Sequence, residues 1–274
     1  MPHYLYSMAN FGDLILDALK IADAADIVEI GAEYGEMSER LLAQAHALGG
    51  SFTSIDPAPR AEFLDWVAAH PDAHHVSEPS LLALTHVAAA DAWIVDGDHN
   101  WFTVYHELVM IRAASTRAAK PLLVFLHDVS WPCARRDFYY APEQIPEAYR
   151  HAHSFTAGAS LDWEGLKPHR GLRGHGRLAL AEHEGGPRNG VLTAVEDFIA
   201  DSKAGGLPLC YAHVPAALGL GVIFDATAPW AEPLASHLMP WHENKLLAVL
   251  EENRLKNFLD AVELEDSAAQ RRAA

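Results

Sequence analysis

The sequence has 274 residues, half of them hydrophobic and 21% charged, with a formal net charge of −17. This length and composition indicate a globular chain with a substantial core, and the negative charge disfavours nucleic acid and anionic membranes as partners. Cys133 and Cys210 are too few for a disulfide framework, and residues 1–6 lack the basic and apolar regions of a signal peptide. We therefore expect a cytoplasmic protein.

Short apolar runs alternate with amphipathic helical patterns along the first half of the chain. Strands that alternate with helices predict a mostly parallel sheet covered by helices on both faces, the doubly wound, Rossmann-like α/β class. The expected helices are 11–25, 37–48, 62–70, 80–89 and 101–119, and the expected strands are 26–30, 52–55, 74–76, 92–95 and 122–126.

The alternation stops after the fifth strand. Residues from about 129 to 189 are rich in His, Arg, Gly and Pro and show no sustained period. Because compact domains rarely carry so long an irregular segment without a use for it, we interpret it as an insertion that covers a site. A helix is expected at 191–203, followed by apolar runs at 209–214 and 219–224. The short link between these two runs predicts a terminal antiparallel hairpin.

The C-terminal part is mostly helical between residues 231 and 263. We therefore predict a domain over 1–225 and a helical extension over 226–274. The apolar side chains of this extension can pack on the domain or on a second subunit, so a homo-oligomer stays open. These side chains are Leu246, Leu247, Val249, Leu250, Leu255, Phe258 and Leu259.

A glycine turn follows the first strand. Glu29 near the end of that strand precedes Gly31 and Gly35, and a helical pattern opens directly afterwards. A strand, a glycine turn and a helix start form a nucleotide-sized crevice in an α/β sheet. Asp56 closes the second strand at the separation from Gly31 that a ribose-binding carboxylate has. The pattern predicts a cofactor that contains adenosine.

Residues 28–35, Val-Glu-Ile-Gly-Ala-Glu-Tyr-Gly, resemble the acidic-x-Gly-x-x-x-Gly turn of class I S-adenosylmethionine-dependent methyltransferases, and the order of elements over 11–225 resembles that family too. The strand ends Val-Asp-Gly-Asp-His-Asn at 95–100 and Leu-His-Asp-Val at 126–129 are similar to its metal-dependent O-methyltransferase branch, which includes natural-product tailoring enzymes. Ala32 and Glu33 stand where a dehydrogenase keeps glycine beside a pyrophosphate, which favours S-adenosylmethionine over NAD.

The resemblance implies roles for particular residues. A divalent metal, Mg²⁺ foremost with Mn²⁺, Fe²⁺ or Zn²⁺ as alternatives, would be held by Asp96 and Asp128 with His127 or Asp98. The candidate catalytic residues are Asp96, His99 and His127. Asp96 can help with the substrate proton in the family that the chain resembles, and the two histidines are candidate general bases, since histidine titrates near neutrality. The cofactor-binding candidates are Glu29, Gly31, Ala32, Tyr34, Gly35, Asp56, Ser77 and Asp96.

The same polar residues also have structural interpretations. Asp96 and Asp98 can cap the helix that begins near residue 101, and Asp128 can end a strand in a turn. His127 can be a buried histidine bonded to the backbone. The charged cluster at 135–137 can bind an acidic or aromatic substrate, or it can form a structural ion pair.

The function that these patterns favour is methyl transfer from S-adenosylmethionine to a hydroxyl group of a small molecule, assisted by a divalent metal. Three alternatives stay open: a metal-independent methyltransferase with His99 or His127 as its base, an NAD-linked oxidoreductase, and a non-catalytic assembly protein. The sequence does not identify the acceptor as a sugar, a phenol or a hydroxylated peptide, and N- or C-methylation is also compatible with it.

Overall fold

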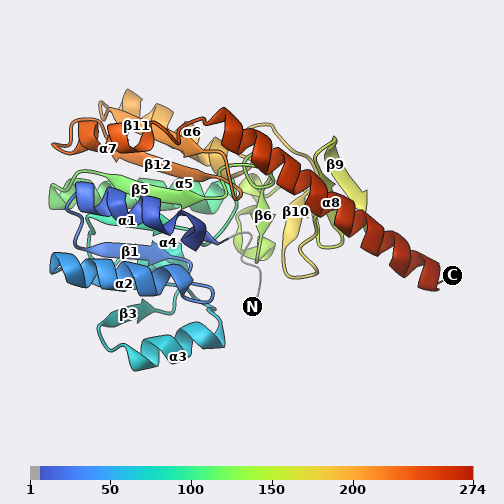
Figure 1. Cartoon of the computed structure of the whole chain (residues 1–274), viewed down its shortest axis with the longest axis horizontal. Helices are drawn as coiled ribbons and strands as arrows, with labels where there is room; N and C mark the ends of the chain where they lie inside the picture. The colour runs from blue at the N-terminus through green and yellow to red at the C-terminus, as the bar shows by residue number, and fades with distance from the viewer. Residues whose placement is uncertain (1–6, 274) are drawn as a thin grey trace.

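A seven-stranded sheet forms the centre of the computed structural model, which describes residues 7–273 (Figure 1). Residues 1–6, where the sequence shows no signal-peptide pattern, lie outside this range. Strands β1 to β5 run parallel, and β12 is antiparallel to both β5 and β11. The predicted α/β class and the terminal hairpin are confirmed. The order is β11 (Leu209–Val214), β12 (Leu220–Asp225), β5 (Leu123–His127), β4 (Ala92–Val95), β1 (Ile27–Ile30), β2 (Phe52–Ile55) and β3 (Ala73–Val76).

Helices cover both faces of the sheet and bury two apolar layers. One layer contains side chains of α1, α2 and α7, and the other contains side chains of α4, α5 and α6. Because both faces are covered, all four residues of β1 are buried, as in parallel sheets generally. The helices are α1 (Gly12–Ile21), α2 (Glu36–Leu48), α3 (Ala61–Ala69), α4 (Ser80–Ala83), α5 (Trp101–Ala118), α6 (Val191–Ala204), α7 (Ala231–Leu238) and α8 (Lys245–Ala273), with short 3₁₀ turns at Met8–Phe11, Pro142–Gln144 and Glu147–Tyr149.

Two helix predictions were too long. The helix expected at 11–25 begins as a 3₁₀ turn and ends at Ile21. The helix expected at 80–89 ends at Ala83, because the N–H groups of Thr85 and His86 bond three residues back and tighten the chain into turns.

The insertion at 129–189 is not irregular, which corrects the sequence interpretation. It forms a three-stranded sheet of β6 (Phe138–Tyr139), β10 (Ala179–Ala181) and β7 (His153–Ser154), and a two-stranded sheet of β8 (Ala157–Ser160) and β9 (Trp163–Pro168). Most of these strands are too short to show an alternating pattern in the sequence. Since the insertion follows β5, it lies at the carboxyl end of the parallel strands, beside the sheet in Figure 1.

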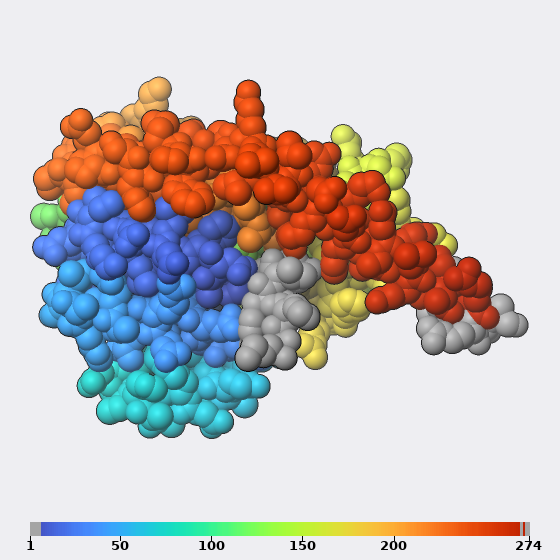
Figure 2. Space-filling view, viewed as in Figure 1, coloured from blue at the N-terminus to red at the C-terminus, as the bar shows by residue number. Residues whose placement is uncertain are grey.

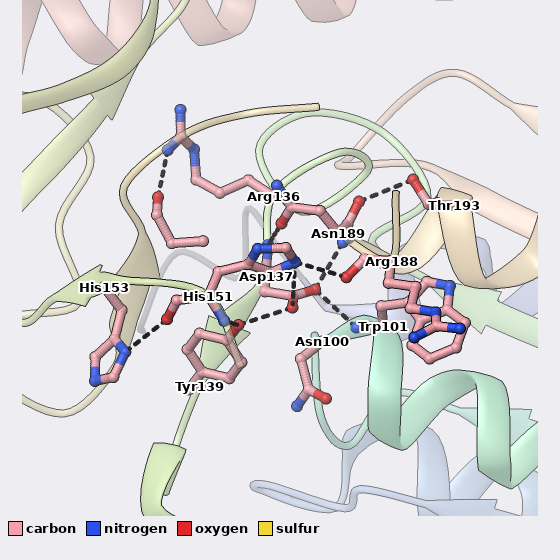
Figure 3. A network of polar contacts seen from close by, with 12 residues as sticks. Asn100, Trp101, Arg136, Asp137, Tyr139, His151, His153, Arg188, Asn189 and Thr193 are labelled. Carbon is pink, nitrogen blue, oxygen red and sulfur yellow. Dashed lines mark hydrogen bonds and ion pairs between the residues drawn. The ribbon is translucent and has the colours of Figure 1, made fainter. Parts of the chain in front are cut away.

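Asp137 anchors the insertion to the two long helices behind the sheet (Figure 3). Its carboxylate accepts hydrogen bonds from the N–H groups of Trp101 and Gly190, at 2.7 and 2.6 Å, and from the hydroxyl of Tyr139 at 2.8 Å. Asn189 in turn accepts the N–H of Asp137 at 2.7 Å. The network joins the starts of α5 and α6 to β6, so it fixes the insertion on the domain.

The two arginines before Asp137 are structural as well. Arg135 forms a two-pronged ion pair with Glu196 of α6, and the fully buried Arg136 donates to the carbonyl groups of Ala181 and Glu164. Of the two interpretations of this cluster, the described contacts favour the structural one.

Helix α8 runs from the sheet across the insertion (Figures 1 and 2). Arg170 and Arg173 of the insertion pair with Glu263 and Asp266 of this helix. Leu255 is buried, whereas Leu246, Val249 and Leu250 are exposed. A domain boundary at residue 225 stays a prediction. Within residues 7–273, no helix combines the length and hydropathy needed to cross a membrane.

Candidate cofactor and metal site

The glycine turn after β1 lies directly against the end of β4. Gly31 has φ +90°, and a Cβ atom at this position would lie 2.1 Å from the carbonyl oxygen of Asp96. The Gly31 N–H donates to the carbonyl of Ile55 at 2.9 Å, and the Asp96 N–H donates to that of Ile30 at 2.8 Å. Only glycine tolerates both this dihedral angle and this close approach, so the turn and Asp96 are fixed relative to one another.

Asp56 holds the same turn from the other side. One oxygen of its carboxylate accepts the N–H groups of Ala32 and Glu33 at 2.9 and 3.3 Å, and the second accepts that of Ala58 at 2.8 Å. Tyr34 lies in the turn with the guanidinium of Arg60 5.5 Å from its ring centre. The carboxylate that the sequence assigns to the ribose is therefore positioned by the backbone of the turn.

Glu29 is a buried carboxyl group beneath the turn. It accepts hydrogen bonds from the hydroxyls of Ser38 at 2.5 Å and Ser54 at 3.0 Å. Burial, with smaller contributions from the charges of Asp96 and Asp56, raises the pKa of Glu29 to about 8. At neutral pH the group is mostly protonated, so it lies in the cavity wall without adding a full charge.

Three polar side chains at the carboxyl ends of β4 and β5 form a group that could hold a metal ion. Asp96, His99 and Asp128 each offer one ligand atom, and these atoms lie within 4.8 Å of one another. Nδ1 of His99 is 3.1 Å from a carboxylate oxygen of Asp128. His99 follows β4 in a loop that pairs with Phe138 of the insertion. The insertion thus places the third member of the group.

His127 lies behind these residues and is almost fully buried. Its Nε2–H donates to the carbonyl of Ala217 at 2.9 Å, and Nδ1 lies 3.2 Å from Asp96 and 3.4 Å from Asp128. Burial opposes a charge here, but the two carboxylates outweigh it and raise the pKa of His127 well above its usual value. The ring thus lies between the Ala217 carbonyl and the carboxylates of Asp96 and Asp128, and its role as a base stays a prediction.

Asp98 has its acceptor capacity occupied locally. Its carboxylate accepts the His99 N–H at 3.0 Å, the Asn100 amide at 2.6 Å and the Thr103 hydroxyl at 2.9 Å. Asn100 itself caps α5 by accepting the Thr103 N–H. The cap of α5 is therefore Asn100 rather than Asp96 or Asp98, and Asp98 supports the first turn through the Asn100 amide and the Thr103 hydroxyl. The roles of Asp98 and His127 as metal ligands stay predictions.

One cavity of about 1180 Å³ contains the turn and the metal-type group. Of the predicted residues, Glu29, Gly31, Ala32, Tyr34, Asp56, Asp96, Asp98, His99 and Asp128 line it. Gly35, Ser77 and His127 are not among the lining residues, and Ser77 is exposed beside β3.

Part of the remaining cavity wall comes from the insertion at 129–189, and part comes from segments that the sequence did not connect with the site. Ser7 and Met8 line it from the N-terminal side. Such residues carry no local motif, because only the tertiary fold brings them to the cavity. Large apolar and aromatic side chains among the other lining residues include those of Phe102, Trp131, Phe138, Tyr140, Leu255 and Phe258.

No protein-family model matches the sequence, and no curated protein sequence matches it. Similar solved structures include the SAH-bound methyltransferase PaMTH1 of Podospora anserina, with a TM-score of 0.49 and 14% identity over 80% of this chain and 79% of that chain. Another is the O-methyltransferase TomG of Streptomyces achromogenes, involved in tomaymycin synthesis and solved with SAM, with a TM-score of 0.47 and 14% identity over 81% of this chain and 82% of that one. At these identities the similarity concerns the fold.

Proposed function

We propose that this protein transfers a methyl group from S-adenosylmethionine to a hydroxyl group of a small molecule, with a divalent metal held by Asp96, His99 and Asp128. One observation carries the proposal: Asp96 touches the cofactor turn through its backbone and belongs to the metal-type group through its side chain. Both parts lie in one cavity, so a methyl donor and an oriented acceptor would meet there.

The charges around the turn support a cationic cofactor. Glu33, Asp56 and Asp96 line this part of the cavity, and Arg60 is paired with Glu33. Carboxylates favour the sulfonium of S-adenosylmethionine, whereas they would repel the pyrophosphate of NAD. Asp56, whose carboxylate is oriented by N–H groups of the turn, would accept hydrogen bonds from the ribose hydroxyls.

The donor set fits a divalent ion. Two carboxylates and an imidazole, with ligand atoms within 4.8 Å of one another, are the kind of donors that a divalent ion takes. A histidine among the ligands favours Mn²⁺, Fe²⁺ or Zn²⁺ more than Mg²⁺. When bound, the ion would lower the pKa of the acceptor hydroxyl and orient it.

The remaining volume is suited to the acceptor. Its walls are mainly apolar and aromatic, from the insertion and α8, which favours a bulky acceptor with an apolar body, as in natural-product tailoring. The Tyr140 side chain is 55% exposed, and its ring centre lies 5.9 Å from that of His99. Tyr140 would therefore contact the acceptor close to the reacting oxygen.

A metal-independent methyltransferase is the second candidate function, because His99 and Asp128 also form the pair that activates a general base. In that case His99 would take the proton of the acceptor hydroxyl, and Asp128 would orient the ring. The two free cysteines support the cytoplasmic location that we propose for either enzyme.

Ligand binding and chelation test the proposal. We expect S-adenosylhomocysteine, and not NAD, to raise the melting temperature, because only a ligand of the folded state stabilises it. Removal of metal with a chelator should abolish methylation of a panel of phenolic and catecholic acceptors, and Mn²⁺ should restore it. The variant Asp128→Asn should lose most turnover, whereas Asp65→Asn, an exposed carboxylate on α3, should retain it. Stabilisation by NAD alone would refute the cofactor, and activity that survives chelation would favour the second candidate.

A further inference from the structure

The link between β11 and β12 has an unusual backbone. Ala217, Leu218 and Gly219 have φ angles of +45°, +67° and +91°, so three successive residues occupy the left-handed region. This region is disfavoured for alanine and strongly so for a bulky leucine. Residues persist in such a conformation only where surrounding contacts impose it. The contacts of this link, residues 216–219, must therefore hold it in the left-handed conformation.

Two carbonyl groups of the link hold the end of β5. The Nε2–H of His127 donates to the Ala217 carbonyl at 2.9 Å, and the N–H of Ser130 donates to the Leu218 carbonyl at 2.8 Å. These two bonds lie on either side of Asp128 in the sequence. The conformation of the link thus determines where the His127 ring lies, and this ring contacts the carboxylates of Asp96 and Asp128.

The link is held in turn by α8. The N–H of Leu218 donates to Oε1 of Glu251 at 3.0 Å, in a buried environment. Glu251 is 8% exposed, and Arg254 fixes its carboxylate with two hydrogen bonds of 2.7 Å. Leu255, one turn further along, lines the cavity. A charged helix residue is therefore placed to impose the left-handed conformation on the link.

The same helix also holds the insertion. Beyond the cavity, Glu263 and Asp266 of α8 pair with Arg170 and Arg173. One helix thus contacts both the insertion and the link, and Figure 1 shows it running across the insertion.

We propose that Glu251 is a positioning residue for the metal-type group. Glu251 holds the link in place, and the link orients His127 against Asp96 and Asp128. Helix α8 is then a part of the active site. The metal-binding role of these carboxylates rests on the proposed function, whereas the chain of contacts from Glu251 to His127 does not.

Two measurements on the full-length protein test the proposal separately. The first is the imidazole N–H signal of His127 in ¹⁵N-edited NMR, assigned with His127→Gln. We expect a slowly exchanging signal in the wild type and its loss in Glu251→Ala. The second is Mn²⁺ affinity by calorimetry, which we expect to fall at least tenfold in Glu251→Ala, as for other residues that orient metal ligands. Affinity for S-adenosylhomocysteine should change little, because Glu251 bonds to the link and to Arg254 and is not among the residues that line the cavity.

Matched variants separate positioning from a general structural role. Glu252→Ala removes the neighbouring exposed carboxylate and should change neither measurement. Glu251→Gln keeps an oxygen acceptor for the Leu218 N–H and should restore the His127 signal. If Glu251→Ala does not fold, Glu251→Asp, which keeps the charge but shortens the side chain, should weaken the signal and the Mn²⁺ affinity together.

Distinct results would overturn each part. A protected His127 signal and wild-type Mn²⁺ affinity in a folded Glu251→Ala variant, or in Glu251→Asp where Glu251→Ala does not fold, would refute the positioning role. A wild-type protein that binds no Mn²⁺ but shows the Glu251-dependent His127 signal would refute the proposed metal and leave the chain of contacts established.

Discussion

Replacement of Gly31 by alanine tests why the glycine turn after β1 needs glycine. The reason can be the dihedral angle alone, or also the close approach of the Asp96 backbone. Alanine in the left-handed region costs about 1–2 kcal/mol. A Cβ atom at Gly31 would lie 2.1 Å from the Asp96 carbonyl oxygen, where ordinary contacts begin at 3.4 Å, so that backbone has to retreat by more than 1 Å. Overpacking of this kind costs about 1–3 kcal/mol more. We therefore expect Gly31→Ala to lose about 2–5 kcal/mol of unfolding free energy.

Gly49 provides the matched control, because it ends α2 with φ +75° and a Cβ atom there would have nothing within 4 Å. Gly49→Ala should lose only the cost of the dihedral angle, about 1–2 kcal/mol. Urea unfolding measures both losses, and calorimetry with Mn²⁺ and S-adenosylhomocysteine measures binding. Because the displaced carbonyl belongs to Asp96, Gly31→Ala should also weaken Mn²⁺ binding, while Gly49→Ala should not. Equal stability losses, with unchanged Mn²⁺ affinity, would refute the reasoning.

Three further substitutions test other parts of the structure. Burial raises the pKa of Glu107 to about 8, so the folded state keeps a proton that the unfolded chain releases above about pH 4.5. The Glu107 proton should therefore make stability fall as pH rises from about 4.5 to 8, by up to about 1.4 kcal/mol per pH unit. The buried Glu29 adds a second contribution over the same range. Glu107→Gln should reduce the slope measured by urea unfolding without removing it, and an unchanged slope would contradict the assignment. Asp137→Ala leaves two buried N–H groups and a tyrosine hydroxyl without their acceptor, so we expect a loss of about 3 kcal/mol or more by the same method, and a loss below about 1 kcal/mol would show that the network is dispensable. Arg173→Ala breaks a largely buried ion pair with Asp266. Hydrogen exchange should become faster in the insertion and in the outer turns of α8, while the sheet stays protected. Unchanged exchange in both segments would show that this ion pair does not hold the insertion to α8.

Local patterns in the sequence predicted the parts of the fold that depend on neighbouring residues. Strand β1 is a short, mostly apolar run that Gly31 ends, and both signals lie within a few residues of one another. The strand and the turn were therefore predicted at nearly the observed bounds. Asp96 and Asp128 were expected to share one metal ion, and the structure brings them together because the carboxyl ends of neighbouring parallel strands meet at one edge of the sheet.

Contacts distant in sequence could not be predicted in the same way. His99 joins the metal-type group because its loop pairs with Phe138, and nothing in either sequence segment indicates that pairing. His127 is adjacent to Asp128 in the sequence, yet its ring bonds to Ala217 behind the group. The strands of the insertion are mostly two to four residues long, too short for a periodic pattern.

The cavity is walled by segments from both ends of the described chain, with Ser7 and Met8 on one side and Leu255 and Phe258 of α8 on another. During synthesis, the sheet can assemble from residues that emerge before α8. Because α8 follows β12 in the chain, a nascent chain with a finished sheet still lacks one wall of the cavity. The cavity is therefore completed only after the sheet and the glycine turn can already form.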